Sequence, residues 1–151
     1  MKRRAWRIVQ QQQADTAFDG KDARLYGGRW NCPGTPLVYT TATRFLELFV
    51  NLHETSQLEN YVFIPVDFSE TLVKKKRHAH LPKYWRDSPP SDTTKDLGTQ
   101  WANTLAAAIL EVPSAVVPGE SNYLLNPIRP DYKKIKIGKL ETIEFDPRLQ
   151  R

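Results

Sequence analysis

Short apolar runs recur along the chain, and most are bounded by glycine, proline or small polar residues. In Ala5–Val9, Trp6 and Ile8 alternate with Arg7 and Val9, which is typical of a strand. Proline cannot donate to a strand ladder, so Pro65 puts its strand at a sheet edge or a bulge. The predicted strands are Ala5–Val9, Leu37–Thr40, Tyr61–Phe68, Val112–Val117, Lys134–Ile137 and Thr142–Phe145.

Two stretches show the wider spacing that is typical of helices. In Thr43–Glu54, apolar residues recur at helical intervals and leave Glu47 on the polar side. Asp96 is a candidate cap for an Ala-rich helix that runs to Glu111. The residues expected to face inward on this second helix are Trp101, Leu105, Ala108 and Ile109.

Loops and turns separate these elements. We expect loops over Gln10–Asp22 and Leu81–Asp96, and turns over Tyr26–Arg29 and Pro33–Pro36. Short strands interrupted by two helices, without a regular strand-helix-strand alternation, indicate an α+β fold. The chain has no internal repeat and no linker, so we expect one domain over residues 1–151.

Composition narrows the class of protein. The chain is 40% hydrophobic and 11% aromatic, which favours a folded globular domain. Cys32 is its single cysteine, so neither a disulfide framework nor a thiolate metal cluster is expected. We expect no signal peptide and no membrane span, and therefore a cytoplasmic protein. The net charge of +5 suggests an anionic ligand or partner.

The stretch from Arg24 to Asn51 is the richest in chemistry, because it contains GGRWN, the strand PLVY and the helix ELFVNL. Together with AWRI at the N-terminus and VPSAVVPGESNYLLNP near residue 120, these motifs resemble the RES-domain proteins, the toxins of RES–Xre type II toxin–antitoxin systems. The resemblance extends over nearly the whole chain. It implies a fold similar to the ADP-ribosyltransferases of the diphtheria-toxin kind, and an enzyme that consumes NAD as its substrate.

The resemblance also implies which residues form the site. Arg7 in AWRI and Arg29 in GGRWN correspond to the two arginines of an NAD pocket, and Tyr39 to its aromatic residue. Glu47 corresponds to the acidic residue, with Asn51 at the position of the family's histidine, whereas an ungapped alignment puts Val50 there and leaves no carboxylate. Ser114 in VPSAVV corresponds to the family's serine. Asn122 in SNYLLNP is a weaker candidate for a role in the site.

The residue types suit this chemistry. Arginine forks bind a pyrophosphate through parallel hydrogen bonds, and an aromatic face attracts the cationic nicotinamide. Cleavage of the nicotinamide–ribose bond passes through an oxocarbenium-like state that a carboxylate such as Glu47 stabilises. Ser114 has no neighbouring base to make it a nucleophile, so we expect it to orient the substrate, or else to satisfy local backbone at a strand end.

The acceptor of the ADP-ribosyl group stays open at this point. Water gives hydrolysis of NAD, phosphate gives phosphorolysis, and a protein side chain gives ADP-ribosylation. We favour degradation of NAD. A protein ADP-ribosyltransferase is the alternative, and its docking surface would be Leu81–Asp96.

A further alternative is a basic module that binds nucleic acid through Lys74–His80. The two histidines in that run lack the carboxylates or thiols of a metal site, and we expect no metal. By resemblance, the partner is an antitoxin with an Xre-like helix-turn-helix part, which covers the NAD cleft and binds DNA on behalf of the complex.

Overall fold

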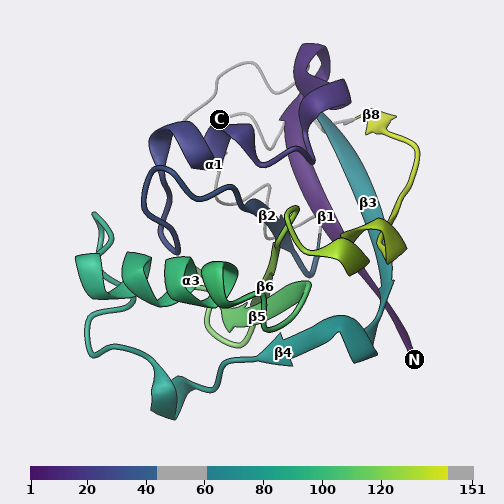
Figure 1. The fold of residues 1–151 in the computed structure, drawn as a ribbon. Helices are drawn as coiled ribbons and strands as arrows, with labels where there is room; N and C mark the ends of the chain where they lie inside the picture. Colours follow the sequence, from purple (N-terminus) through teal and green to yellow (C-terminus); the bar gives the residue numbers. More distant parts are fainter. Residues whose placement is uncertain (44–60, 143–151) are drawn as a thin grey trace.

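The computed structural model describes residues 1–43 and 61–142, which form a mixed α+β fold around one curled sheet (Figure 1). The described strands lie in the order β4-β5-β6-β2-β1-β3-β7, and β8 also pairs with β3. Neighbouring strands are antiparallel except for β4 and β5. The strands are β1 (Lys2–Gln10), β2 (Val38–Thr41), β3 (Tyr61–Ser69), β4 (Val73–Lys75), β5 (Ile109–Pro113), β6 (Ser121–Leu125), β7 (Lys136–Ile137) and β8 (Glu141–Thr142).

The helices of the described residues are short apart from one. They are α1 (Lys21–Tyr26) and α3 (Asp92–Thr104), with 3-10 turns η1 (Gln11–Thr16), η3 (Glu70–Leu72), η4 (His78–His80) and η5 (Pro130–Lys134). Within residues 1–43 and 61–142, no helix has the length and apolar character needed to span a membrane.

The sheet has two halves that meet almost at a single point. β1 pairs with β3 along its whole length, from Lys2↔Ser69 to Gln10↔Tyr61, but with β2 only at Trp6↔Thr41. In Figure 1, β1 and β3 run upright whereas β4 and β5 run across the picture. The sheet therefore bends sharply between β1 and β2.

An apolar core fills the inside of the bend. One half of the sheet contributes Ala5 and Phe68, and the other contributes Val38 and Leu125 to the same cluster. Ala5, Val38 and Leu125 are fully buried. Burial of this shared core is the hydrophobic driving force that curls the sheet.

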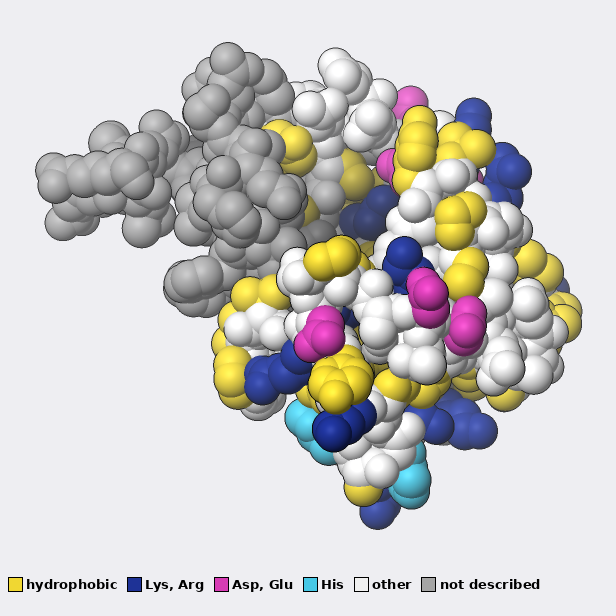
Figure 2. All heavy atoms as spheres, turned by 90° about the vertical axis from the view of Figure 1, so that its left-hand side faces the viewer, with side chains coloured by type: hydrophobic (Ala, Val, Ile, Leu, Met, Phe, Trp, Pro, Cys, Tyr) yellow, Lys and Arg dark blue, Asp and Glu magenta, His cyan; other side chains and the backbone are white. Residues whose placement is uncertain are grey.

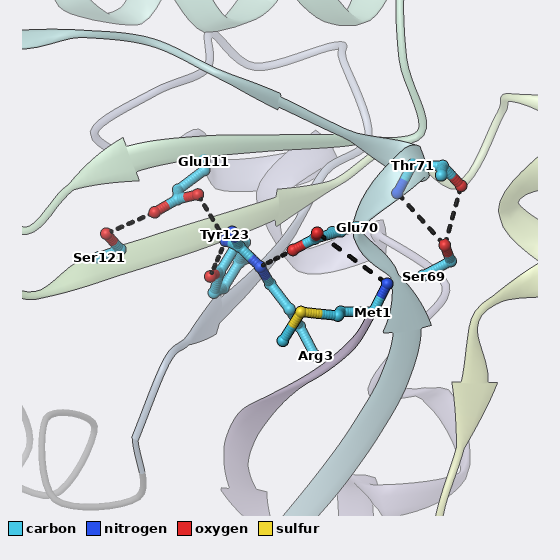
Figure 3. Close-up of polar contacts among 8 residues, drawn as sticks. All are labelled: Met1, Arg3, Ser69, Glu70, Thr71, Glu111, Ser121 and Tyr123. Carbon is cyan, nitrogen blue, oxygen red and sulfur yellow. Dashed lines mark hydrogen bonds and ion pairs between the residues drawn. The ribbon is translucent and has the colours of Figure 1, made fainter.

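A polar network closes one end of this core (Figure 3). Arg3 Nη1 donates to Glu111 Oε1 and to the Tyr123 hydroxyl, both at 2.9 Å, and Arg3 Nε donates to Glu70 at 3.2 Å. Ser121 Oγ donates to the other oxygen of Glu111 at 2.9 Å. Arg3 thus ties β1 to β5 and β6 across the bend, where no ladder connects them.

A second apolar cluster lies on the other face of β2, β5 and β6. It contains Trp30, Trp85 and Trp101, and α3 packs against it. The contact is close at Gly98, where an added Cβ would lie 1.7 Å from the carbonyl oxygen of Trp30. Only glycine lets α3 approach the loop after α1 so closely.

Several strand predictions are confirmed with shifted bounds. The expected strands at Ala5–Val9, Leu37–Thr40 and Tyr61–Phe68 correspond to β1, β2 and β3. Pro65 lies inside β3, which is not an edge strand. On the side of β3 that faces β7 and β8, Pro65 falls between the residues paired with β7 and those paired with β8. Of the closing strands, Lys134–Ile137 shortens to β7, because residues up to Lys134 belong to η5, and Thr142–Phe145 lies outside the described residues beyond Thr142.

The predicted helix from Asp96 to Glu111 is wrong at both ends. α3 begins earlier, because Ser91 Oγ accepts the Thr94 N–H as its cap, and it ends at Thr104, because the next residue, Leu105, has φ 54°. Ile109 and Glu111 belong to β5, and Leu105 is 41% exposed instead of facing inward. An apolar run of this kind suits a buried strand as well as a helix, and periodicity cannot separate the two.

One predicted strand and one predicted loop differ from the structure, and one predicted helix lies among residues that the structure does not describe. The predicted strand Val112–Val117 ends at Pro113, because Ser114 begins a turn. The expected loop Gln10–Asp22 contains η1 and the start of α1. The helix predicted over Thr43–Glu54 lies almost wholly outside the described residues.

The Arg3 network predicts a stability difference between two neighbouring arginines. Arg3→Met leaves the Glu111 carboxylate, 9% exposed, without its cation. Breaking a fully buried pair costs about 3–5 kcal/mol; because 38% of the Arg3 side chain is exposed, we expect the free energy of unfolding to fall by about 2 kcal/mol in urea titrations.

Arg4→Met is the matched control, because Arg4 pairs with Asp67 in solvent. It should leave the urea midpoint almost unchanged. Equal losses in the two variants would contradict a structural role for the Arg3 network.

Candidate functional site

A cavity of about 700 Å³ opens beside the point where β1 and β2 diverge. Its walls come from β1, η1, α1, the loop after α1, β2 and the turn that joins β5 to β6. Arg7, Arg29, Tyr39, Ser114 and Asn122 all line it. The structure therefore brings together the predicted site residues that it describes.

Arg7 extends from the same face of β1 as Arg3 and Ala5. Its Nε donates to the Ala17 carbonyl at 2.6 Å and its Nη1 to the Tyr39 carbonyl at 3.1 Å. These bonds hold the guanidinium at the wall of the cavity and bridge the gap between β1 and β2. Arg7 is thus a fixed cavity residue, not a solvated arginine on a strand.

Arg29 follows the glycine pair that ends α1. Gly27 has φ 73°, which glycine adopts without strain, and it turns the chain into the GGRWN segment. Arg29 Nη1 donates to the carbonyls of Trp85 at 3.1 Å and Asp87 at 2.7 Å. Burial lowers the pKa of the guanidinium, while Tyr39 and Asp87 raise it, and an arginine stays charged throughout.

Tyr39 is held through its hydroxyl group. It donates to Asn31 Oδ1 at 2.6 Å and accepts the Trp30 N–H at 3.0 Å. Gly28 lies so close that an added Cβ would be 2.6 Å from this hydroxyl. Burial raises the pKa of Tyr39 well above its usual value, so the hydroxyl remains a donor at neutral pH.

Asn31 is the hub of this arrangement and is fully buried. Its Nδ2 donates to the carbonyls of Ala23 at 2.9 Å and Thr35 at 3.0 Å, and it lies 3.2 Å from that of Cys32. Together with the Tyr39 bond, these contacts connect α1, the following loop and β2. The position of Arg29, two residues before Asn31, is consequently fixed by buried bonds.

Ser114 and Asn122 approach the cavity from β5 and β6. Ser114 is 2% exposed, and its Oγ accepts the N–H groups of Val116 at 3.1 Å and Val117 at 3.0 Å. The expected role in satisfying local backbone is thus confirmed, while its role toward a substrate stays a prediction. The side-chain amide of Asn122 forms no hydrogen bond with any residue that the structure describes, while its backbone belongs to the ladders with β2 and β5.

Glu47 and Asn51 lie outside the described residues. Trp30, the tryptophan of the GGRWN motif, is 3% exposed and belongs to the second core cluster. Over residues 1–43 and 61–142, no three His, Cys, Asp or Glu side chains gather as a metal site would require.

The sequence did not reveal Asn31 or the two carbonyls that Arg29 binds. Asn31 belongs to the GGRWN motif, and that position was the available signal. Asparagine can satisfy several backbone groups of a tight loop at once, so its place after the glycine pair pointed to a loop-bracing role. The Trp85 and Asp87 carbonyls carried no signal, since backbone acceptors are the same at every residue.

The chain is similar to known proteins over most of its length. A family model described as "RES domain" matches residues 4–146. A protein of Sphingobium sp. (strain YBL2) named "Prs ADP-ribosylating toxin" is 34% identical over 154 residues, covering 97% of this chain and 96% of that protein. "Toxin Res" of Photorhabdus laumondii is 32% identical, covering 93% of this chain and 91% of its own length.

A solved structure shares the fold. A chain of the crystal structure of the M.tuberculosis MbcT-MbcA toxin-antitoxin complex is similar with a TM-score of 0.77 at 18% identity. The similarity covers 99% of this chain and 87% of that one.

The hydroxyl of Tyr39 should contribute measurably to stability. Tyr39→Phe keeps the ring but leaves the Trp30 N–H and Asn31 Oδ1 without this partner. We expect the free energy of unfolding to fall by about 1–3 kcal/mol in urea titrations. Tyr26→Phe is the control, because Tyr26 is 80% exposed, and an equal loss there would refute the bracing role.

The same hydroxyl predicts a pH dependence. The pKa of Tyr39 is raised above the usual 10.0, so the folded state keeps a proton that the unfolded state releases. Its contribution is complete below pH 10 and declines as pH rises above 10. Tyr132, whose pKa burial raises to about 12, adds to the decline. In urea titrations between pH 9 and 11, Tyr39→Phe should flatten the slope of stability against pH, and an unchanged slope would contradict this assignment.

Proposed function

This chain belongs to the RES domain family, and on that premise we propose that it is the toxin of a toxin–antitoxin pair that cleaves the nicotinamide–ribose bond of NAD. The observation that carries the proposal is the convergence of Arg7, Arg29, Tyr39, Ser114 and Asn122 on one cavity. These residues come from five separate parts of the chain. The fold we propose is that of the diphtheria-toxin-like ADP-ribosyltransferases, formed by a single domain over residues 1–151.

The two arginines support binding of the NAD pyrophosphate. Both are held by carbonyls before any substrate arrives. Both bonds of Arg29 use Nη1, and its Nε and Nη2 form no hydrogen bond with any described residue. A fork that is already oriented loses little entropy when it binds a phosphate.

The remaining residues act around the bond that breaks. We assign Tyr39 to the nicotinamide ring, and Ser114 and Asn122 to the ribose or the carboxamide, with Ser114 still able to donate its hydroxyl hydrogen. Glu47 is the carboxylate that stabilises the oxocarbenium-like ribose. NAD and water then give ADP-ribose, neutral nicotinamide and a proton, whereas phosphate in place of water gives a phosphorylated ADP-ribose. NAD is the substrate here, and the proposal involves no resident cofactor.

Transfer of ADP-ribose to a protein is a second candidate. It is favoured by the Sphingobium relative, whose name is "Prs ADP-ribosylating toxin". A purely nucleic-acid-binding function is less well supported, because it leaves the cavity and its arginines without a role.

The proposed partner is an antitoxin with an Xre-like helix-turn-helix part that covers the cavity and supplies DNA binding. The solved structure with a similar fold comes from a toxin–antitoxin complex, which supports an antitoxin partner. The Xre-like part and its place over the cavity are what the family resemblance implies. We also propose a cytoplasmic location, because the proposed substrate NAD is a cytoplasmic metabolite.

Turnover of NAD by the purified chain tests the proposal. Arg29→Ala should lower kcat/KM roughly 30-fold, because a charge-assisted bond to the pyrophosphate is lost. This fall corresponds to about 2 kcal/mol of transition-state binding. Glu47→Gln should lower kcat more than it changes KM. Repeating the assay with and without phosphate identifies the small acceptor.

Arg24→Ala is the matched control, since Arg24 is exposed on α1 and does not line the cavity. It should retain wild-type turnover. Equal activity of Arg29→Ala and Arg24→Ala would rule out the assigned pyrophosphate site. Turnover that survives Glu47→Gln would instead assign the catalytic carboxylate elsewhere.

A further inference from the structure

The net positive charge of the chain is concentrated in one short segment. Residues Lys74–Asp87, here called the basic segment, contain six of the 22 Lys and Arg residues and one of the 17 Asp and Glu residues. The rest of the chain therefore carries 16 of each sign, and the basic segment accounts for the whole formal charge of +5. Its basic residues are Lys74, Lys75, Lys76, Arg77, Lys83 and Arg86.

This charge lies on the surface. All of these side chains are exposed except that of Lys76, which is half-buried. The segment runs from β4 through η4 to the loop before α3. Figure 2 shows Lys and Arg side chains, with the histidines, gathered at the lower end of one face of the molecule. The patch is thus open to a partner of opposite charge.

The basic segment is attached to the wall of the cavity. Arg29, a cavity residue, donates to the carbonyls of Trp85 and Asp87 inside the segment. Trp85 is 8% exposed, and its ring lies 6.2 Å from that of Trp30 and 5.5 Å from that of His78. A partner that binds the segment is therefore positioned beside the cavity.

We propose that the basic segment is the surface on which a protein that accepts ADP-ribose docks through an acidic face. This rests on the proposed cleavage of NAD. In the transfer step, the bond from ribose C1″ to the nicotinamide nitrogen breaks and nicotinamide leaves neutral. A new bond joins C1″ to an oxygen or nitrogen of the acceptor, which loses its proton.

The composition of the segment suits a transient protein partner. Its one strongly exposed large apolar side chain is Tyr84, 56% exposed, with the Lys83 ammonium 5.4 Å from the ring centroid. A stable inhibitory complex needs a larger apolar interface, whereas a charged surface with one aromatic anchor speeds association and permits release. Single-stranded nucleic acid is usually bound on several exposed rings, and Trp85 is buried.

The experiment uses the full chain and NAD labelled in its adenylate phosphate, with and without an extract of host cells. The variant Lys83→Glu/Arg86→Glu reverses two exposed charges of the segment. The control Lys133→Glu/Lys134→Glu reverses two exposed charges on η5, which lies at the other side of the molecule (Figure 1). Label on protein and loss of NAD are measured in parallel.

We expect the segment variant to transfer about one tenth or less of the label that the wild-type chain transfers to protein. Its turnover of NAD without extract should stay within about twofold of wild type. The control should retain both. Poly-L-glutamate should inhibit transfer by the wild-type chain without slowing turnover, and less so at high salt.

Other outcomes overturn the proposal. Transfer that is unaffected by Lys83→Glu/Arg86→Glu, or NAD turnover without any labelled protein, removes the docking role. Stronger inhibition by single-stranded DNA than by poly-L-glutamate of equal charge would assign the segment to nucleic acid. An antitoxin that suppresses transfer by the wild-type chain but not by Lys83→Glu/Arg86→Glu would assign the surface to that partner. If the wild-type chain consumes no NAD under any condition, the proposed function fails, and binding of labelled poly-L-glutamate still tests whether the segment takes an acidic chain.

Discussion

The Arg3–Glu111 ion pair joins two halves of a sheet whose ladder is matched at only one residue pair. β1 and β2 are matched only at Trp6↔Thr41, so the ladder does not determine how the halves are oriented. The shared core on the inside of the bend supplies the attraction, and Arg3 fixes the closure at one end through Glu111 and Tyr123. Arg7 lies on the same face of β1, directly after Trp6, where β1 and β2 part. One strand face therefore holds an ion pair, a core residue and a cavity arginine in succession.

The loop that carries Arg29 is rigid because buried groups on three sides hold it. Asn31 satisfies carbonyls from α1 and from its own loop, Tyr39 binds it from β2, and α3 approaches through Gly98. Each contact permits little variation, since the glycine positions exclude a Cβ and the asparagine uses both ends of its amide. A charged group that is oriented before binding stabilises a developing charge without reorganisation at the moment of reaction. The tight packing around GGRWN thus serves the site as well as the fold.

The features that could be predicted from the sequence are those that follow from local hydrophobic patterns or from recognisable motifs. The α+β class, the strands β1, β2 and β3, and the residues that converge on the cavity could all be predicted in this way. The helix placed over Asp96–Glu111 was wrong, because its Ala-rich apolar run fitted two kinds of element and only the pairing of Ile109 with Leu125 separates them. The network around Arg3 was not foreseen for a different reason. Arg3 and Glu111 are 108 residues apart, and no periodicity connects them.

We propose that the identity of the acceptor is decided outside the cavity. In the proposed function, hydrolysis, phosphorolysis and ADP-ribosyl transfer all break the same bond, and we assign the same arginines, aromatic residue and carboxylate to all three. They differ only in which nucleophile stands beside ribose C1″ when nicotinamide leaves. Water and phosphate reach that point by diffusion, but a protein side chain reaches it only if its own surface is held nearby. Because Arg29 contacts both the cavity and the backbone of the basic segment, a partner bound there is held next to the substrate.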